Sequence, residues 1–141
     1  MINKLQGYNC IIVYNPDQSK ILFCKRTKDP YKGKYNLVGG KIEDNEDGFI
    51  AAYRELFEET GIKSADLTLH HMMDFTYYNQ NCYVEVYVGI LSNPVYLVEE
   101  VNPLEWLDVS MNFFDLNIFA GEGNIGHMVE QVKDYGLGIK N

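Results

Sequence analysis

The sequence has few of the features that mark secreted or membrane proteins. Only three cysteines occur among its 141 residues, Cys10, Cys24 and Cys82, and they are widely spaced without a CxxC pair. An odd number of isolated cysteines does not build a disulfide framework, so we expect buried free thiols. No apolar run approaches the ~20 residues of a membrane-spanning helix, and the N-terminal "MINKLQGYNC" lacks the apolar centre of a secretory signal. We therefore expect a cytoplasmic protein.

Positive charge is also in deficit. Twelve lysines and arginines stand against twenty aspartates and glutamates, which gives a formal net charge of −8. Without a basic patch, this charge disfavours binding to nucleic acid or to an anionic membrane. A small anionic substrate remains compatible if a bound divalent cation reverses the local field. No linker, repeat or low-complexity run divides the chain, so residues 1–141 are expected to form one domain.

The hydrophobic pattern predicts an α/β fold. Two β-rich runs, "GYNCIIVYN" and "KILFCKR", flank a turn-like "PDQS" and predict a hairpin. The runs "DLTLHHMMDFTYY" and "CYVEVYVGIL" predict a second pair of strands, and "EWLDV" predicts a short one. Apolar residues at helical spacing predict one helix before Gly61 and a second from Ile125 to Tyr135. This order favours a mixed sheet with helices packed on its faces.

The first predicted helix has recognisable ends and an apolar side. Asp44 or Asn45 can cap its start, and Gly61 occupies a position where helices often end in a left-handed residue. The predicted apolar stripe comprises Phe49, Ala52, Tyr53 and Leu56. These residues recur at i, i+3, i+4 and i+7, so this side of the helix is expected to pack on the sheet.

The same helix carries many like charges. Glu55, Glu58 and Glu59 stand at i, i+3 and i+4, which places their carboxylates on one helix face. Each such like-charge pair costs roughly a few tenths of a kcal/mol. Arg54, four residues before Glu58, relieves only part of this repulsion. One interpretation is a solvated acidic face; the other is a cation outside the helix, because Mg²⁺ prefers carboxylate oxygens.

The spacing of neighbouring residues favours the cation. In the stretch "GGKIEDNEDGFIAAYRELFEETGI" the pattern is Gly40-x5-Glu46-x7-Arg54-Glu55-Leu56-x-Glu58-Glu59-x-Gly61-Ile62. This pattern resembles the box that defines the Nudix (MutT-type) hydrolases, with no departure at any box position. Its fixed Gly, Glu and Arg positions would match by chance less than about once in a million such sequences.

The resemblance implies both a fold and a reaction. The fold is an α/β/α sandwich with a mixed sheet, in which the box forms a loop-helix-loop that holds divalent metal. The reaction is hydrolysis of a nucleoside diphosphate linked to another group X, giving a nucleoside monophosphate and phosphorylated X. The implied cofactor is Mg²⁺, or Mn²⁺, and the implied partner is a small nucleotide. A homodimer is compatible, since many relatives dimerise.

Phosphoanhydride hydrolysis needs screening of phosphate charge, an aligned water and a base, and metal ions supply the first two. Glu58 and Glu59 are the expected metal ligands. Glu55 is either a ligand or the general base. The resemblance adds a backbone carbonyl near the first box glycine, at Gly39 or Gly40, where the absent side chain lets the backbone approach the ion.

Two further box residues are expected to support the site. Arg54 would orient a glutamate, and Glu46 would stabilise the loop or the helix N-terminus. Outside the box, "NPLEWLDV" places Glu105 directly before a tryptophan, where the oxidised-purine branch of the family has another metal ligand. A surface glutamate beside a packed tryptophan is the alternative interpretation. Glu99 and Glu100 are rivals for the same role.

Substrate recognition is expected outside the box. Lys25 and Arg26 end a predicted strand where the oxidised-purine branch has a phosphate-contacting arginine, although strand ends are often charged for solvation alone. The segment "FAGEGNIG" resembles the region of a base-contacting asparagine, which nominates Asn124; helix capping is its alternative role. Tyr78 resembles a tyrosine of diadenosine polyphosphate hydrolases. Val38 stands where many oxidised-purine enzymes have proline, which weakens that assignment.

The expected function is Mg²⁺-dependent pyrophosphohydrolysis of a nucleoside triphosphate such as 8-oxo-dGTP. Diadenosine polyphosphate or nucleotide-sugar hydrolysis is an alternative. A nucleotide sensor without turnover is another, but sensors tend to lose box glutamates that this chain retains. Isoprenoid diphosphate isomerisation would need a thiol, for which Cys82 is a candidate, and an acid partner that the sequence does not identify. His70, His71 and His127 show no spacing that requires a metal, and His70 and His71 are expected on opposite sides of a strand.

Overall fold

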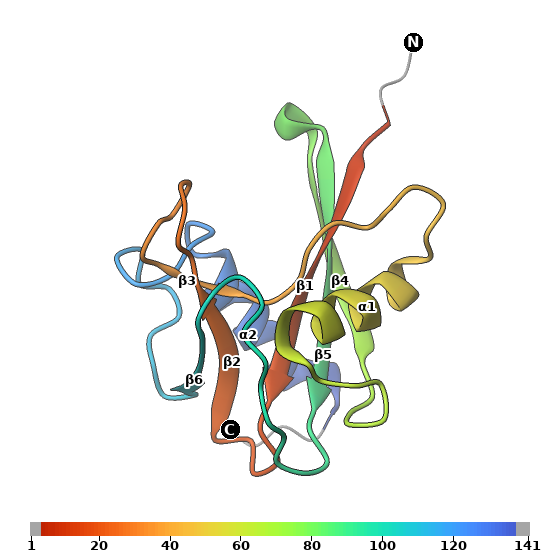
Figure 1. Cartoon of the computed structure of the whole chain (residues 1–141). Helices are drawn as coiled ribbons and strands as arrows, with labels where there is room; N and C mark the ends of the chain where they lie inside the picture. The colour runs from red at the N-terminus through yellow and green to blue at the C-terminus, as the bar shows by residue number, and fades with distance from the viewer. Residues whose placement is uncertain (1–3, 138–141) are drawn as a thin grey trace.

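One mixed sheet organises the chain in the computed structural model, which describes residues 4–137 (Figure 1). Its strands are β1 (Gln6–Tyr14), β2 (Lys20–Lys25), β3 (Tyr35–Leu37), β4 (His70–Tyr77), β5 (Cys82–Ile90) and β6 (Leu104–Asp108). The strand order is β3-β2-β1-β5-β4, and β6 pairs with β2 on a separate branch. Strands β1 and β5 are parallel, whereas the other pairs are antiparallel. The predicted mixed sheet is therefore confirmed.

Two helices cover opposite faces of this sheet. Helix α1 (Gly48–Thr60) lies on one face and α2 (Asn124–Tyr135) on the other, and a short 3₁₀ helix, η1 (Tyr78–Gln80), joins β4 to β5 (Figure 1). Alternate residues of β1 contact the two cores: Ile12 packs in the α2-side core, and Ile11 in the α1-side core. Both are fully buried. This alternation produces the predicted α/β/α sandwich.

The predicted N-terminal hairpin is confirmed, but its two strands diverge. They pair antiparallel near the turn, where Tyr14 lies opposite Ile21. Strand β1 then runs beside β5, while β2 pairs with β3 and β6. Residues 38–41 form isolated bridges to β1 at Ile11 and Tyr8. The segment that carries the first box glycine is therefore fixed against the central strand.

Helix α1 begins later than predicted. The capping residue is Asp47, whose side chain accepts hydrogen bonds from the backbone N–H groups of Phe49 and Ile50 at 2.9 and 3.2 Å. The prediction of Asp44 or Asn45 as the cap was wrong. Asn45 has a φ of 63°, in the left-handed region, whereas Asp47 has the extended backbone that a helix cap requires.

The other helix ends agree more closely with the sequence. Gly61 ends α1 with a φ of 79°, and its N–H donates to the Phe57 carbonyl oxygen at 2.9 Å, as predicted for a left-handed cap. Gly123 holds the capping position of α2, so Asn124 is the first helical residue and not the cap. The buried residues of α1 are Ala51, Ala52, Leu56 and Thr60; Phe49 of the predicted stripe is 41% exposed.

Neither helix between residues 4 and 137 combines the length and apolarity that a bilayer crossing requires.

Candidate active site

Arg54 connects the charged residues of the box. Its Nε and Nη2 donate to the two carboxylate oxygens of Glu46 at 2.7 and 2.9 Å. Its Nη1 donates to Glu55 at 3.1 Å and to Glu58 at 3.0 Å, and Nη2 also donates to the Lys41 carbonyl oxygen at 3.0 Å. The Arg54 guanidinium holds the pKa of Glu46 well below its usual range, at about 2. A two-pronged arginine–carboxylate pair fixes orientation as well as charge, so Arg54 ties the box loop to α1.

The Glu55 carboxylate lies directly beside the Gly40 backbone. A Cβ atom at residue 40 would stand 2.4 Å from a Glu55 carboxylate oxygen, so only glycine permits this approach. The Gly40 N–H donates to Asn9 Oδ1 at 3.0 Å, and its carbonyl oxygen accepts from the Asn9 N–H at 2.8 Å. A carbonyl oxygen has two lone pairs, so that of Gly40 retains capacity for a cation. Burial raises the pKa of Glu55, and Arg54 partly offsets this effect.

Glu59 is the most deeply placed carboxylate of the box. Its Oε2 accepts a hydrogen bond from the Gly39 N–H at 2.9 Å. Burial raises the pKa of Glu59 to about 7; the Gly39 bond opposes this shift, and the charges of Glu55 and Glu58 add to it. Ionisation of Glu59 beside these two carboxylates is therefore unfavourable unless a cation joins them. The donor set and its electrostatics fit a hard divalent cation.

These glutamates open into a cavity of about 810 Å³. Its acidic part is lined by Glu55, Glu58, Glu59 and Glu100, and its apolar part by Phe57, Tyr96, Val98 and Val101. Lys63 is the only cation among the described lining residues. Tyr96 is 98% exposed and Val101 is 78% exposed, so the apolar part is an open wall. The volume suits a ligand of nucleotide size.

Glu105 is not brought into this cluster. Strand β6 pairs with β2 so that Leu104 lies opposite Cys24 and Glu105 lies opposite Phe23. Leu104 packs against the α1-side core, whereas Phe23 belongs to the α2-side core. Alternation along β6 therefore turns the Glu105 side chain toward the α2 face, where its carboxylate accepts a hydrogen bond from the Tyr35 hydroxyl. Its role as a metal ligand stays a prediction.

The two rivals of Glu105 have different positions. Glu99 accepts a hydrogen bond from the Leu104 N–H at 2.7 Å, so its carboxylate holds the start of β6. Glu100 lines the same cavity as the three box glutamates. Among these three residues outside the box, Glu100 is therefore the one that the structure places beside the box.

Lys25 and Arg26 lie at the end of β2, as predicted, and both side chains have local contacts. Lys25 Nζ stands 5.6 Å from the centre of the Tyr35 ring. Arg26 Nε donates to the Pro30 carbonyl oxygen at 2.6 Å and so stabilises its own loop. Phosphate contact by either cation stays a prediction.

Asn124 and Tyr78, the two residues nominated for contact with the base, have different surroundings, and their roles stay predictions. Asn124 Nδ2 donates to the hydroxyl of Tyr77 at 2.6 Å, whereas Tyr78 is 78% exposed in η1. Burial is the main cause of the raised pKa of Tyr77, and the charge of Glu122 adds to it. Glu122 also accepts a hydrogen bond from the Tyr31 hydroxyl at 3.3 Å. This second group of polar and aromatic residues surrounds the start of α2.

Sequence reasoning missed the apolar wall and Lys63. Apart from Phe57 of α1, the wall comes from the loop between β5 and β6, which has no periodic pattern that would reveal its position. The structure docks it on the end of α1, where the Val98 N–H donates to the Thr60 carbonyl oxygen at 2.8 Å. A Cβ at residue 61 would lie 3.0 Å from the Val98 side chain, so Gly61 serves this contact as well as the helix end.

The three cysteines are free, as predicted, but only Cys24 is fully buried. Burial raises the pKa of Cys10 to about 12 and that of Cys24 to about 11, which disfavours a reactive thiolate. Cys82, the candidate thiol of the isomerase alternative, lies opposite Tyr77 at the start of β5. His70 and His71 face opposite sides of β4, as predicted, and their rings contact Tyr135 and Tyr87 respectively.

Comparisons with known proteins identify the family and the fold. The family model described as NUDIX domain matches residues 5–122. The RNA pyrophosphohydrolase of Pelagibacter ubique (strain HTCC1062) is 42% identical over 57 residues, which are 40% of this chain and 35% of that protein. The match therefore spans about a third of the length of this relative.

Two solved structures share the fold over nearly the whole chain. A C. elegans Ap4A hydrolase, solved as a binary complex, is 18% identical with a TM-score of 0.73, and the alignment covers 93% of this chain and 97% of that one. A MutT protein from Methanosarcina mazei Go1 is 18% identical with a TM-score of 0.69, covering 94% and 99%. At these identities the likeness shows the fold alone.

Proposed function

The chain belongs to the NUDIX domain family, and we propose that it is a divalent-metal-dependent pyrophosphohydrolase of nucleoside diphosphates linked to another group. One observation carries the proposal: three box carboxylates line one cavity of about 810 Å³, and the Gly40 backbone lies against one of them, Glu55. A solvated acidic helix face would not need a glycine that makes room for a carboxylate, nor a glutamate that accepts a hydrogen bond from the Gly39 backbone.

Glu58, Glu59 and the Gly40 carbonyl oxygen would hold Mg²⁺ or Mn²⁺. When bound, such a cation screens phosphate charge and lowers the pKa of a coordinated water. Arg54 contributes by orienting Glu55 and Glu58 through Nη1. Glu55 either completes the ligand set or accepts the proton of the attacking water. The two roles differ in Glu55→Gln: loss of a base lowers kcat at saturating metal, whereas loss of a ligand raises the metal concentration required.

The cavity gives the substrate an orientation. Its phosphates would lie at the carboxylate end, where bound cations reverse the negative charge. The base or the X group would lie against Phe57, Tyr96 and Val101, since aromatic and apolar side chains provide a stacking surface. Lys63 would offset the charge of a terminal phosphate. A nucleoside triphosphate such as an oxidised purine nucleotide fits this orientation and is the substrate we propose first.

Diadenosine polyphosphates and nucleotide sugars are alternatives, because no Asn or Gln side chain among the described lining residues selects a base edge. The end of an RNA chain is a second candidate, suggested by the 42% identity to an RNA pyrophosphohydrolase. The formal net charge of −8 disfavours extended contact with RNA, so only the terminal nucleotide would enter the cavity. Sensing without turnover is disfavoured because Glu55, Glu58 and Glu59 are all present.

A substrate panel tests the proposal. It comprises 8-oxo-dGTP, ordinary dNTPs, ADP-ribose, diadenosine polyphosphates, nucleotide sugars and an RNA with a 5′-triphosphate, each with Mg²⁺ and with Mn²⁺ and with products identified. We expect cleavage of at least one compound to a nucleoside monophosphate or its RNA equivalent. The matched control is Glu130→Gln, which removes an exposed carboxylate from α2 on the opposite face. No cleavage of any compound would contradict hydrolysis and favour a sensor.

A further inference from the structure

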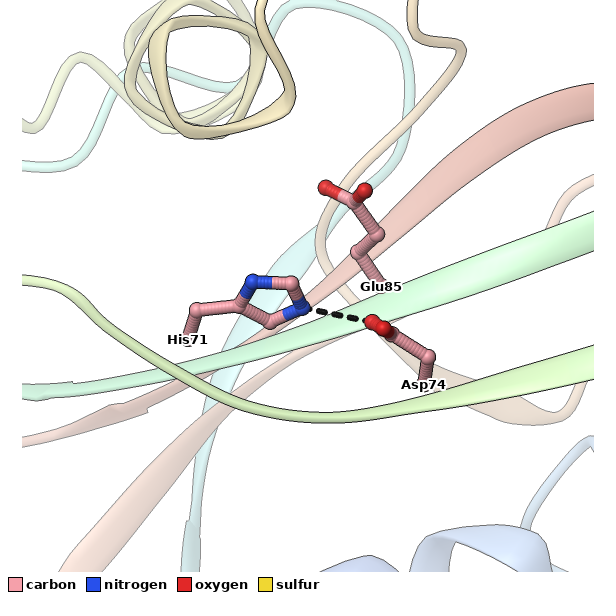
Figure 2. Close-up of side chains that lie close together, drawn as sticks. All are labelled: His71, Asp74 and Glu85. Atoms are coloured by element: carbon pink, nitrogen blue, oxygen red, sulfur yellow. Dashed lines mark hydrogen bonds and ion pairs between the residues drawn. The ribbon is translucent and has the colours of Figure 1, made fainter.

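A second group of side chains that could hold a metal ion lies at the start of α1, whereas Glu58 and Glu59 lie near its end. His71 and Asp74 on β4 and Glu85 on β5 each offer a ligand atom, and these atoms lie within 4.8 Å of one another (Figure 2). The carboxylate of Glu85 adjoins Gly48, the first residue of α1. Gly48 and Glu58 are about 15 Å apart along the helix axis, so the group is separate from Glu58.

A bulge in β4 explains why His71 and Asp74 share a face. Residues three apart on a regular strand point to opposite sides of a sheet. The register of β4 against β5 shifts between His71 and Met73, and both Met72 and Met73 pack against the α2-side core. The extra residue turns His71 and Asp74 together toward the α1 face. This is why the spacing of the histidines in the sequence did not suggest a metal site.

The charges of this group are not balanced by the protein. Asp74 lies directly opposite Glu85 in the β4–β5 pair, and like charges at this position destabilise a sheet. In the part of the chain that the structure describes, no lysine or arginine forms an ion pair with either carboxylate. Among residues 4–137, His71 is the one basic group that pairs with either carboxylate, with its Nε2 2.5 Å from Asp74 Oδ1.

Tyr87 positions two of the three ligands. The His71 ring stacks on the Tyr87 ring with centroids 4.7 Å apart and an interplanar angle of 22°. The Tyr87 hydroxyl donates to Glu85 Oε1 at 2.6 Å. A Cβ at residue 48 would stand 2.0 Å from the same Glu85 oxygen, so Gly48 makes room for this carboxylate under the helix. The imidazole and the carboxylate are therefore held in place before any ion binds.

We propose that His71, Asp74 and Glu85 form a second cation site, selective for a first-row transition ion such as Zn²⁺ over Mg²⁺. One imidazole nitrogen and two carboxylates are a common ligand set for Zn²⁺, whereas Mg²⁺ takes oxygen ligands in a strict octahedron. Ligand atoms around tetrahedral Zn²⁺ lie about 3.3 Å apart. His71 Nε2 and Asp74 Oδ1 are only 2.5 Å apart, so the Asp74 side chain, which is 55% exposed, would move outward by about 0.8 Å to share an ion with His71. The ion would join β4 to β5 beneath the start of α1.

Isothermal titration with Zn²⁺ tests this site without reference to activity. The protein used is the full chain with Glu55→Gln, Glu58→Gln and Glu59→Gln, which removes the carboxylates of the box. We expect one Zn²⁺ per chain and no measurable heat with Mg²⁺. If this triple variant does not fold, wild-type protein in saturating Mg²⁺ replaces it, since Mg²⁺ then occupies the box. Absence of Zn²⁺ binding in both would overturn the proposal.

Single substitutions then locate the ion. His71→Ala or Asp74→Asn in the same background should weaken Zn²⁺ binding at least tenfold. The matched control is His70→Ala, the neighbouring histidine on the opposite face, which should leave it unchanged. Co²⁺ should give visible absorption without the near-ultraviolet band of a cysteine thiolate. Unchanged Zn²⁺ affinity in His71→Ala would refute the site and show that His71 and Asp74 form only an ion pair in the wild type. A thiolate band would assign the ion to a cysteine instead.

Discussion

Carboxylates lie close together at both ends of α1, but their negative charge is balanced differently at the two ends. Near the box glutamates the protein supplies its own cation, because Arg54 forms ion pairs with Glu46, Glu55 and Glu58. At the other end, Asp74 and Glu85 face each other with a single histidine. Glu59 accepts a backbone hydrogen bond from Gly39, and Glu55 and Glu58 are bound by Arg54, whereas His71 and Asp74 are exposed side chains on a strand. A site with oxygen ligands fixed by the backbone suits a hard cation and phosphate, and a site with an imidazole suits a softer ion.

The largest expected effect is a loss of activity on substitution of the glutamates near the end of α1. Glu58→Gln or Glu59→Gln should lower kcat/KM by more than about 100-fold, beyond the 10–100-fold typical of partners that do not touch the metal. The change removes charge but keeps shape, so the loss reflects weaker cation binding. Initial rates over a range of Mg²⁺ concentrations measure it. Full activity in both variants would show that the box end is not the catalytic one.

Arg54→Lys should have the next largest effect, a loss of about 10–100-fold in kcat/KM. Lysine keeps the positive charge but cannot pair with both oxygens of Glu46 while also reaching Glu55 and Glu58. If Arg54 acts by positioning the glutamates, the metal concentration required should rise together with the fall in rate. The control is Lys133→Gln, which removes a cation from an exposed ion pair on α2 and should change neither quantity. An unaltered metal requirement would argue against the positioning role.

A pH effect of about 3 kcal/mol between pH 5 and pH 8 is expected in the metal-free protein, since the pKa of Glu59 lies about 2 units above pH 5 and each unit corresponds to about 1.4 kcal/mol. Burial raises the pKa of Glu59 from 4.5 to about 7, so the folded state favours its protonated form. The stability that this gives is complete below about pH 4.5 and is lost as pH rises through about 7. The free energy of unfolding in urea, measured as Glu59→Gln minus wild type, should therefore be more positive at pH 8 than at pH 5. Saturating Mg²⁺ should abolish the difference, and equal pH profiles would contradict a buried Glu59.

The smallest expected effect on activity concerns the other end of α1. His71→Ala should change kcat/KM by less than about twofold, because its site lies about 15 Å along the helix from Glu58. Rates in Mg²⁺ with all transition ions chelated measure this, and Glu58→Gln provides the contrast. A loss as large as that of Glu58→Gln would mean that the two ends act as one site.

Local patterns predicted most of the fold because its main signals are short-range. The apolar periodicity of α2, the alternation of β5 and the left-handed position of Gly61 each depend on neighbouring residues, and the structure has all three. The start of α1 was misplaced because Asp44, Asn45 and Asp47 are equally good caps by type. Only the backbone conformation selects Asp47.

In the candidate site, too, the short-range features were predicted and the long-range ones were not. The box spacing placed Glu55, Glu58 and Glu59 together, since one helix carries all three. Glu105 was nominated by its neighbour in the sequence, but strand register turns its side chain to the α2 face. The wall around Tyr96 and the site at His71 depend on loop docking and on a β-bulge, which leave no periodic trace in the sequence.

The most direct test of the proposed function follows substrate cleavage by ³¹P NMR in Mg²⁺ with wild type and Glu59→Gln side by side. Wild type is predicted to convert at least one compound of the panel to a nucleoside monophosphate, or its RNA equivalent, and a phosphorylated second product. Glu59→Gln is predicted to retain less than about 1% of that rate, in keeping with loss of a metal ligand. Equal rates in the two proteins, or no cleavage of any compound by wild type, would contradict the account.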